Sequence, residues 1–123
     1  MKRDVGLYLD DILDAISKIE EYTADLDYER FQYDKKTIDA VIRNFEIIGE
    51  AAKNIPDEIR AEHLPVPWKE MAGMRDKLAH EYFGIRYDVV WSTIKTRLPE
   101  LKSMIQSVLQ QYNAEMDNVD NKD

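Results

Sequence analysis

The sequence predicts an all-α fold, a four-helix up-and-down bundle with short additional helical turns. Apolar residues recur at spacings of three and four along several segments, which is typical of helices with one buried face. The chain has only 4 Gly and 4 Pro in 123 residues, too few for a β-rich protein with many tight turns. Because this length suits one hydrophobic core, we expect the main helices to form a single bundle.

The first helix is predicted from residue 4 to about residue 22. Its polar side places Asp14 and Lys18 one helical turn apart, which favours an ion pair between them. Its opposite side carries an apolar stripe, formed by Val5, Leu9, Ile12, Leu13, Ile16 and Ile19.

The second helix follows Asp34, which we expect to cap its N-terminus. Its apolar positions run over residues 38–55, and Pro56 ends it. Gly49 lies inside this helix, where glycine costs about 1 kcal/mol relative to alanine. We therefore expect Gly49 to permit close packing against another helix.

Prolines are expected to set the helix boundaries in the second half of the bundle. Residues 56–67 are expected to form an irregular crossing with about one helical turn, and Pro67 suits the first position of a third helix over residues 68–82. A fourth helix is predicted to start at Asp88. Pro99 then breaks or kinks that helix, or opens a new one.

The last residues lack apolar periodicity and are acidic. We therefore assign residues 1–113 to the helical bundle and expect residues 114–123 to be a disordered tail.

Composition limits the possible functions. The chain has no cysteine, which excludes disulfides and thiolate metal sites and agrees with a cytoplasmic location. We find no signal-peptide pattern and no apolar run of about 18 residues, so no membrane segment is expected. The net charge of −8 disfavours general nucleic-acid binding, unless basic groups gather in one place.

The two histidines differ in their surroundings. His63 lies in a polar connector and is expected to be a solvated surface residue. His80 lies near the end of the predicted third helix, in a segment crowded with polar residues. One interpretation of His80 is a cation at a helix C-terminus, which contributes about 0.3–1 kcal/mol. The other is a general acid or base, because imidazole titrates near neutral pH.

Arg75 supports the second interpretation. A guanidinium group presents a planar set of donors that fits a phosphate and stabilises its growing negative charge. Together, Arg75 and His80 are suited to drive attack of an RNA 2′-hydroxyl on the neighbouring phosphate without a metal. Asp76 either orients one of these two residues or is a surface residue.

Helical geometry argues against a site formed by one regular helix. Residues 75 and 80 lie roughly 140° apart on an ideal helix, whereas residues 75 and 82 nearly coincide. Either the helix loosens before Gly84, or a second subunit completes the site. The sequence contains no glycine-rich phosphate loop and no cluster with metal-ligand spacing, so no metal and no cofactor are expected.

The motif Arg75-x4-His80-x-Tyr82 resembles the signature of HEPN-domain ribonuclease toxins of the HepT-like family, formerly a domain of unknown function. The resemblance covers residues 3 to about 110 and includes several further segments in the same order. These are Arg3-Asp4 through Leu13, Asp39 through Lys53, Pro67-Trp68, Met74 through Gly84, Val90-Trp91 and Leu98-Pro99-Glu100-Leu101.

The resemblance implies a HEPN-type bundle that forms a homodimer, in which Arg75 and His80 of two subunits share one cleft. Lys77 would add positive charge there, as a supporting residue beside Asp76. The implied activity is metal-independent cleavage of RNA. The family often has Asn where this chain has Asp76, which adds negative charge next to the phosphate site.

The resemblance also implies a partner and a regulatory modification. Such proteins are toxins of type VII toxin–antitoxin systems, in which a minimal nucleotidyltransferase antitoxin transfers AMP to the motif tyrosine, here Tyr82. Bound AMP would place phosphate and bulk where RNA binds. The alternatives are a non-catalytic nucleotide-binding or docking subunit of a nucleotidyltransferase complex, which the acidic charge favours, and a purely structural helical dimer.

Overall fold

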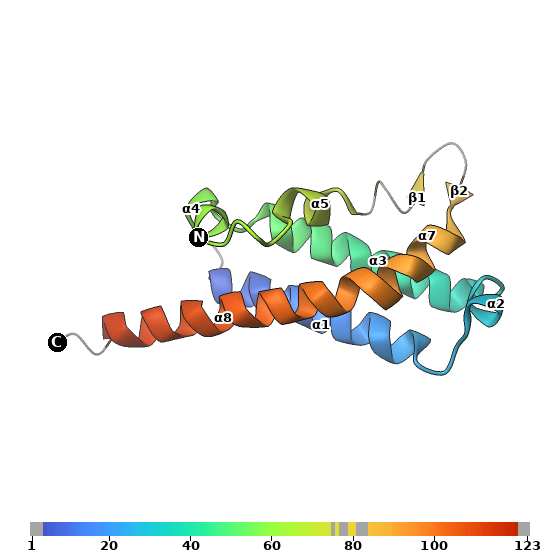
Figure 1. Ribbon diagram of the computed structural model, residues 1–123, viewed down its shortest axis with the longest axis horizontal. Coiled ribbons are helices and arrows are strands. Elements are labelled where there is room, and N and C mark those ends of the chain that lie inside the picture. Colours follow the sequence, from blue (N-terminus) through green and yellow to red (C-terminus); the bar gives the residue numbers. More distant parts are fainter. Residues whose placement is uncertain (1–3, 75, 77–78, 81–83, 121–123) are drawn as a thin grey trace.

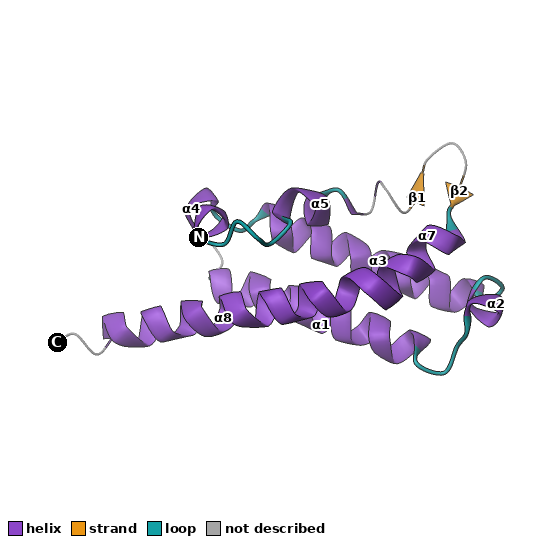
Figure 2. Ribbon diagram, in the orientation of Figure 1, coloured by secondary structure: helices purple, strands orange, loops and turns teal. Residues whose placement is uncertain are grey.

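The computed structural model describes residues 4–74, 76, 79–80 and 84–120. The fold is all-α, as predicted, apart from one pair of two-residue strands (Figure 2). The long helices are α1 (Val5–Thr23), α3 (Lys35–Lys53) and α8 (Leu98–Asp120). The short elements are α2 (Tyr28–Phe31), α4 (Asp57–Glu62), α5 (Trp68–Ala72), β1 (Ala79–His80), β2 (Gly84–Ile85) and α7 (Tyr87–Ser92), with a π-helical turn, η1 (Thr93–Arg97), between α7 and α8.

The chain runs up and down the long axis of the molecule (Figure 1). α1 and α3 lie antiparallel and are joined through α2 at one end, and α4 lies at the other end. From there the chain returns through α5 to the two strands. α7, η1 and α8 then run back along the bundle, so the start of α1 and the end of α8 lie at the α4 end. The strands and α7 therefore lie at the same end of the bundle as α2.

The core is formed by the apolar stripes recognised in the sequence. Leu9 and Ile12 of α1, Phe45 and Ile48 of α3 and Ile105 of α8 are fully buried. Because each such side chain contributes about 1.5–3 kcal/mol when removed from water, this shared interior holds the helices together. None of the described helices is long and apolar enough to cross a membrane.

The predicted helix starts are confirmed. Asp4 caps α1 by accepting a hydrogen bond from the backbone N–H of Gly6 at 2.6 Å. Asp34 caps α3, since its Oδ1 accepts from the N–H of Thr37 at 3.1 Å and its Oδ2 accepts from the Thr37 hydroxyl at 2.8 Å. Lys18 and Asp14 form the expected ion pair at 3.1 Å.

Gly49 permits the close packing expected of it. A Cβ atom at this position would lie 3.2 Å from the carbonyl oxygen of Ala72 and 3.3 Å from that of Met71. These are backbone atoms of α5, so a side chain at Gly49 would push α5 away from α3. The missing side chain thus determines how closely the segment leading to Arg75 approaches the core.

Pro99 lies in the first turn of α8, as expected if it opens a new helix, but η1 joins α8 to α7 without a loop. Proline has no N–H and its ring clashes with the carbonyl four residues earlier. The backbone adapts through η1, where the N–H of Leu98 bonds to the carbonyl of Thr93, five residues back. π-Helical turns of this kind occur mostly as single turns within helices. Here the turn connects α7 directly to α8.

The end of the chain differs from the predicted tail. α8 continues to Asp120, although residues 113–118 are exposed and contribute nothing to the core. Ala114, Glu115 and Met116 favour a helical conformation, and Gln111 donates to Glu115 at 3.1 Å across one turn. Such i,i+4 contacts stabilise a helix that extends an existing one, so disorder is not the conformation of residues 114–120.

The cap at Asp34 makes stability depend on pH. The N–H of Thr37, followed by its hydroxyl, lowers the pKa of the Asp34 carboxyl. Stabilisation by this carboxylate is therefore complete above its unfolded pKa of about 3.9 and disappears as the pH falls through the lower folded pKa. Asp34→Asn keeps a capping oxygen but not the charge. We expect wild type to have the higher Tm near pH 6, and the difference to shrink as the pH falls below about 4.

Thermal unfolding followed by circular dichroism measures this difference. Asp10→Asn, an exposed aspartate within α1, controls for the loss of one negative charge. A Tm difference between wild type and Asp34→Asn that is constant from pH 6 to pH 3 would contradict the role given to the cap.

Candidate functional site

The segment that follows α5 leaves the helical conformation before His80. α5 ends at Ala72, where the N–H of Gly73 bonds back to the carbonyl of Lys69 at 3.1 Å. Met74 and Asp76 are helical again, but β1 is extended. The predicted continuous helix over residues 68–82 is therefore wrong at Ala79 and His80.

An antiparallel pairing replaces the end of that helix. Ala79 pairs with Ile85 and His80 pairs with Gly84. Gly84 has a φ of 75°, which lies in the left-handed region that costs other residues about 1–2 kcal/mol. Glycine at this position therefore permits the strand pair, and the ideal-helix angle between residues 75 and 80 no longer describes their relation.

The structure describes only some of the predicted site residues. The backbone of His80 lies in β1, and Asp76 is exposed. Arg75, Lys77 and Tyr82 lie outside the described residues, so their roles as phosphate clamp, supporting residue and AMP acceptor remain predictions. The structure thus brings the backbone of His80 next to Gly84 and places Asp76 beside α3.

Asp76 lines a groove of about 360 Å³ between α3 and α5. The groove carries charges of both signs, which partly pair with one another. Nη1 of Arg43 lies 3.2 Å from Oε2 of Glu46, and Nζ of Lys53 lies 3.8 Å from Oε1 of Glu50. This groove is therefore not a purely basic channel, although it leads to the start of the motif.

Three contacts fix α5, and with it the segment that enters the motif. Besides the close approach at Gly49, the indole N–H of Trp68 donates to the carbonyl of His63 at 3.1 Å. His63 is half-buried, less exposed than the solvated surface residue that the sequence predicts, and its backbone carbonyl holds α5. The imidazole of His63 takes no part in this contact, because the acceptor is the backbone carbonyl oxygen.

The third contact joins α5 to η1. The guanidinium of Arg97 donates to both carboxylate oxygens of Glu70, through Nε at 3.2 Å and Nη2 at 2.6 Å, and Nη1 donates to Glu100 at 2.9 Å. Glu70 and then Glu100 raise the pKa of Arg97. Sequence reasoning missed this pair, because no pattern links residues that are 27 positions apart.

Within the described ranges, no group of three or more His, Asp or Glu side chains forms a metal-binding cluster. The described polar residues near the motif are instead arranged in ion pairs on and between helices.

The all-α bundle agrees with the HEPN-type helical bundle that the sequence predicts. A family model described as ribonuclease HepT-like matches residues 12–108. The chain is 51% identical over 108 residues to a probable ribonuclease HepT of Thermococcus cleftensis, an alignment that covers 88% of this chain and 98% of that protein.

Two further relatives are named putative RNases. One, from Methanocaldococcus jannaschii, is 47% identical over 108 residues, covering 88% of this chain and 93% of the relative. The other, from Caldanaerobacter subterraneus, is 47% identical over 103 residues, covering 84% and 92%. No solved structure gives a significant match. The chain belongs to the ribonuclease HepT-like family, and this membership supports a ribonuclease function.

The bidentate contact predicts how α5 responds to substitution of Arg97. Arg97→Lys keeps the charge but lacks the planar pair of donors that bonds the two oxygens of Glu70 in parallel. Since exposed ion pairs contribute up to about 1 kcal/mol, we expect amide hydrogen exchange at Met71 and Gly73 to become up to about fivefold faster. Mass-spectrometric or NMR detection of exchange measures this local opening.

Arg43→Lys is the matched control, because its partner Glu46 lies on the same helix. That variant is expected to leave exchange in α5 unchanged. Equal exchange in wild type and Arg97→Lys would show that the contact with Glu70 does not hold α5 in place.

Proposed function

We propose that the protein is the toxin of a type VII toxin–antitoxin system, a ribonuclease that cleaves RNA without a metal. The observation that carries the proposal is the family match over residues 12–108, which spans the whole motif from Arg75 to Tyr82. The named ribonucleases among its relatives support the activity.

The proposed reaction uses the RNA's own nucleophile. His80 accepts the proton of a 2′-hydroxyl, and the 2′-oxygen forms a bond to the adjacent phosphorus while the bond from phosphorus to the 5′-oxygen breaks. The departing 5′-oxygen receives a proton from an imidazolium. Arg75 stabilises the negative charge that develops on the phosphate oxygens. The products are a 2′,3′-cyclic phosphate and a free 5′-hydroxyl.

Two subunits would form the site together. In a symmetric homodimer the same surface of both copies meets at the axis, so Arg75 of one copy can act with His80 of the other. Two copies of Arg75, together with Lys77, would also concentrate positive charge in one cleft of an otherwise acidic protein. Concentration of this kind is what phosphate binding requires from a chain with a net charge of −8.

A ribonuclease assay tests the catalytic assignment. Purified protein is expected to cleave single-stranded RNA in the presence of EDTA, and Arg75→Ala and His80→Ala are each expected to lower the rate at least about a hundredfold. His63→Ala is the matched histidine control and should retain activity. In bacteria, expression of the wild type alone should arrest growth, whereas expression of His80→Ala should not.

Wild type that binds RNA without cleaving it would contradict the assignment and favour the alternative of a non-catalytic docking subunit. Equal cleavage by wild type and both motif variants would show that another site or a contaminant is responsible.

The proposed regulation is transfer of AMP from ATP to the hydroxyl of Tyr82 by a nucleotidyltransferase antitoxin. The phenolic oxygen forms a bond to the α-phosphorus, pyrophosphate leaves, and the phenolic proton passes to solvent. The added phosphate lies two residues from His80 in the sequence and blocks the position that RNA would occupy.

Intact-protein mass spectrometry after incubation with the cognate transferase and ATP tests this regulation. We expect the wild type to gain the mass of AMP and to lose cleavage activity, and Tyr82→Phe to gain no mass and to stay active. Tyr33→Phe, which alters an exposed tyrosine elsewhere, is the matched control and should be modified. Mass gain in Tyr82→Phe would exclude Tyr82 as the acceptor.

A further inference from the structure

Aromatic and basic side chains form a surface at the end of the bundle that carries the strand pair. We call it the α2–α7 surface and define it by Tyr28, Tyr33, Lys35, Arg86 and Lys95. These residues come from α2, the start of α3, and the stretch from β2 to η1.

Ring contacts hold the two halves of this surface together. The ring of Trp91 in α7 lies 5.0 Å from that of Phe31 and 6.4 Å from that of Tyr28, measured between centroids. Nζ of Lys95 lies 4.6 Å from the centroid of the same Trp91 ring. Since only Arg86 separates β2 from α7, the surface is continuous with the strands that hold the backbone of His80.

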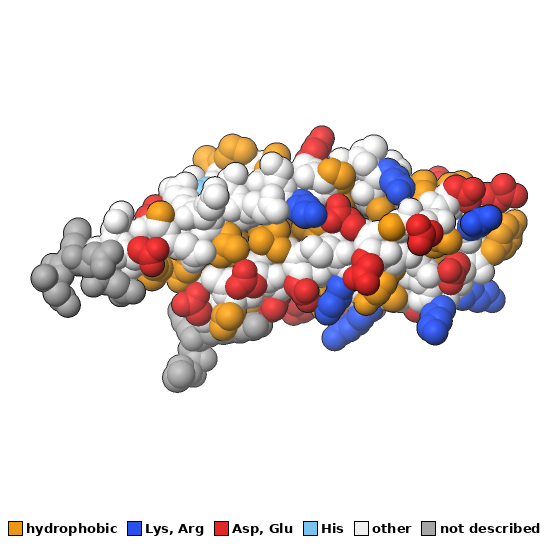
Figure 3. Space-filling model, turned by 90° about the horizontal axis from the view of Figure 1, so that it is seen from below, with side chains coloured by type: hydrophobic (Ala, Val, Ile, Leu, Met, Phe, Trp, Pro, Cys, Tyr) orange, Lys and Arg blue, Asp and Glu red, His pale blue; other side chains and the backbone are white. Residues whose placement is uncertain are grey.

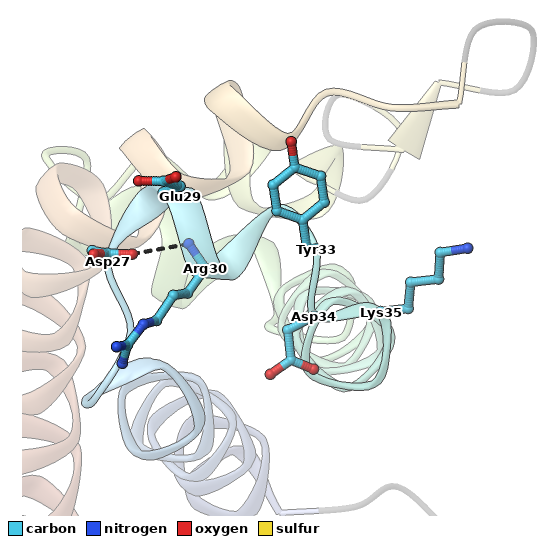
Figure 4. A pocket seen from close by; sticks show the side chains of 6 residues that line it. All are labelled: Asp27, Glu29, Arg30, Tyr33, Asp34 and Lys35. Atoms are coloured by element: carbon cyan, nitrogen blue, oxygen red, sulfur yellow. Dashed lines mark hydrogen bonds between the residues drawn. The ribbon is translucent and has the colours of Figure 1, made fainter.

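Tyr33 is the most exposed aromatic of this surface. Its exposed fraction is 78%. It lines a shallow pocket of about 740 Å³ whose charged side chains are of both signs, Arg30 and Lys35 with Asp27, Glu29 and Asp34. Figure 4 shows its ring directed upward while the side chains of Arg30 and Asp34 point downward. Among the described residues, neither the Tyr33 hydroxyl nor the Lys35 ammonium has a hydrogen-bond or ion-pair partner. A large flat ring and a cation are thus both available to a ligand.

The charge of this end differs from that of the whole chain. Residues 25–37 and 84–97 together contain six Lys or Arg and five Asp or Glu residues, whereas the chain has a net charge of −8. In Figure 3 the visible Lys and Arg side chains of the described part lie from the middle of the molecule to this end, where they alternate with Asp and Glu side chains. Basic groups are therefore concentrated here relative to the rest of the chain.

Two of the acidic groups are already engaged. The Asp34 carboxylate accepts hydrogen bonds from Thr37 at the helix cap. Asp88 accepts from Nε and Nη2 of Arg86 at 3.4 and 3.3 Å, and Arg86 lowers its pKa. Because these two bonds are long and the Arg86 side chain is 61% exposed, its guanidinium still presents donors to a phosphate.

We propose that the α2–α7 surface binds single-stranded RNA outside the cleavage motif, with a base stacked on Tyr33 and backbone phosphates on Lys35 and Arg86. Exposed rings between cations are how proteins bind unpaired strands, because every base has a flat face. In a double helix those faces are covered. The inference rests on the proposed ribonuclease function and identifies its substrate class as unpaired RNA.

Binding is measured separately from cleavage with a fluorescent single-stranded RNA that is fully 2′-O-methylated, so that it lacks the attacking hydroxyl. Tyr33→Ala is expected to bind roughly tenfold more weakly than wild type. Tyr33→Phe keeps the ring and is expected to bind within about twofold of wild type. An RNA duplex of the same sequence should show no difference between wild type and Tyr33→Ala.

Salt dependence tests the two cations. For a single strand, the plot of log K against log salt concentration becomes less steep by about 0.7 for each phosphate that the protein no longer neutralises. Lys35→Gln and Arg86→Gln should each reduce the steepness by that amount. Lys102→Gln, which alters a lysine paired with Glu20 between α8 and α1, should leave the slope unchanged.

This inference would be overturned if wild type and Tyr33→Ala bound the single strand equally well and the salt slope were unchanged in Lys35→Gln and Arg86→Gln. The catalytic proposal would remain intact. Failure of the wild type to cleave unmodified RNA would overturn the catalytic proposal. Loss of affinity in these variants would support the binding inference even then.

Discussion

The close contact between α3 and α5 at Gly49 is the constraint on which the candidate site depends. A Cβ at Gly49 would lie 3.3 Å from the carbonyl oxygen of Met71 and 3.2 Å from that of Ala72, so α5 could keep its place only if these backbone atoms moved by a few tenths of an ångström. The contact fixes one side of α5, and the bidentate bond from Arg97 to Glu70 fixes another. The chain therefore enters the motif from a rigid element and only then leaves the helical conformation, so that His80 lies in a strand.

Elements governed by local sequence are predictable, and elements governed by distant partners are not. The cap at Asp34 and the role of Gly49 follow from residue type and spacing, and the structure confirms them. The predicted third helix extends too far because apolar spacing continues past Gly73, whereas the strand pair depends on pairing with later residues and on the positive φ of Gly84. The predicted disorder after residue 113 rests on missing apolar periodicity, but a helix that is already formed continues at little cost.

The acidic composition and the proposed substrate are compatible because charge is unevenly distributed. Taken over the whole chain, a net charge of −8 argues against RNA. Residues 25–37 and 84–97 nevertheless hold more basic than acidic side chains, and they lie at the end of the bundle that carries the strand pair. A ribonuclease of this kind would depend on local arrangement and on a second copy of its own motif more than on overall charge.

The central claim is that Arg75 of one subunit acts with His80 of another. Mixing Arg75→Ala with His80→Ala protein under conditions that exchange subunits tests it directly, because each mixed dimer would contain one intact site. With random exchange, half of the dimers would be mixed and each would hold one of two sites, so we predict about a quarter of wild-type cleavage activity. Activity no higher than that of either variant alone, with mixed dimers confirmed by native mass spectrometry, would contradict a shared site.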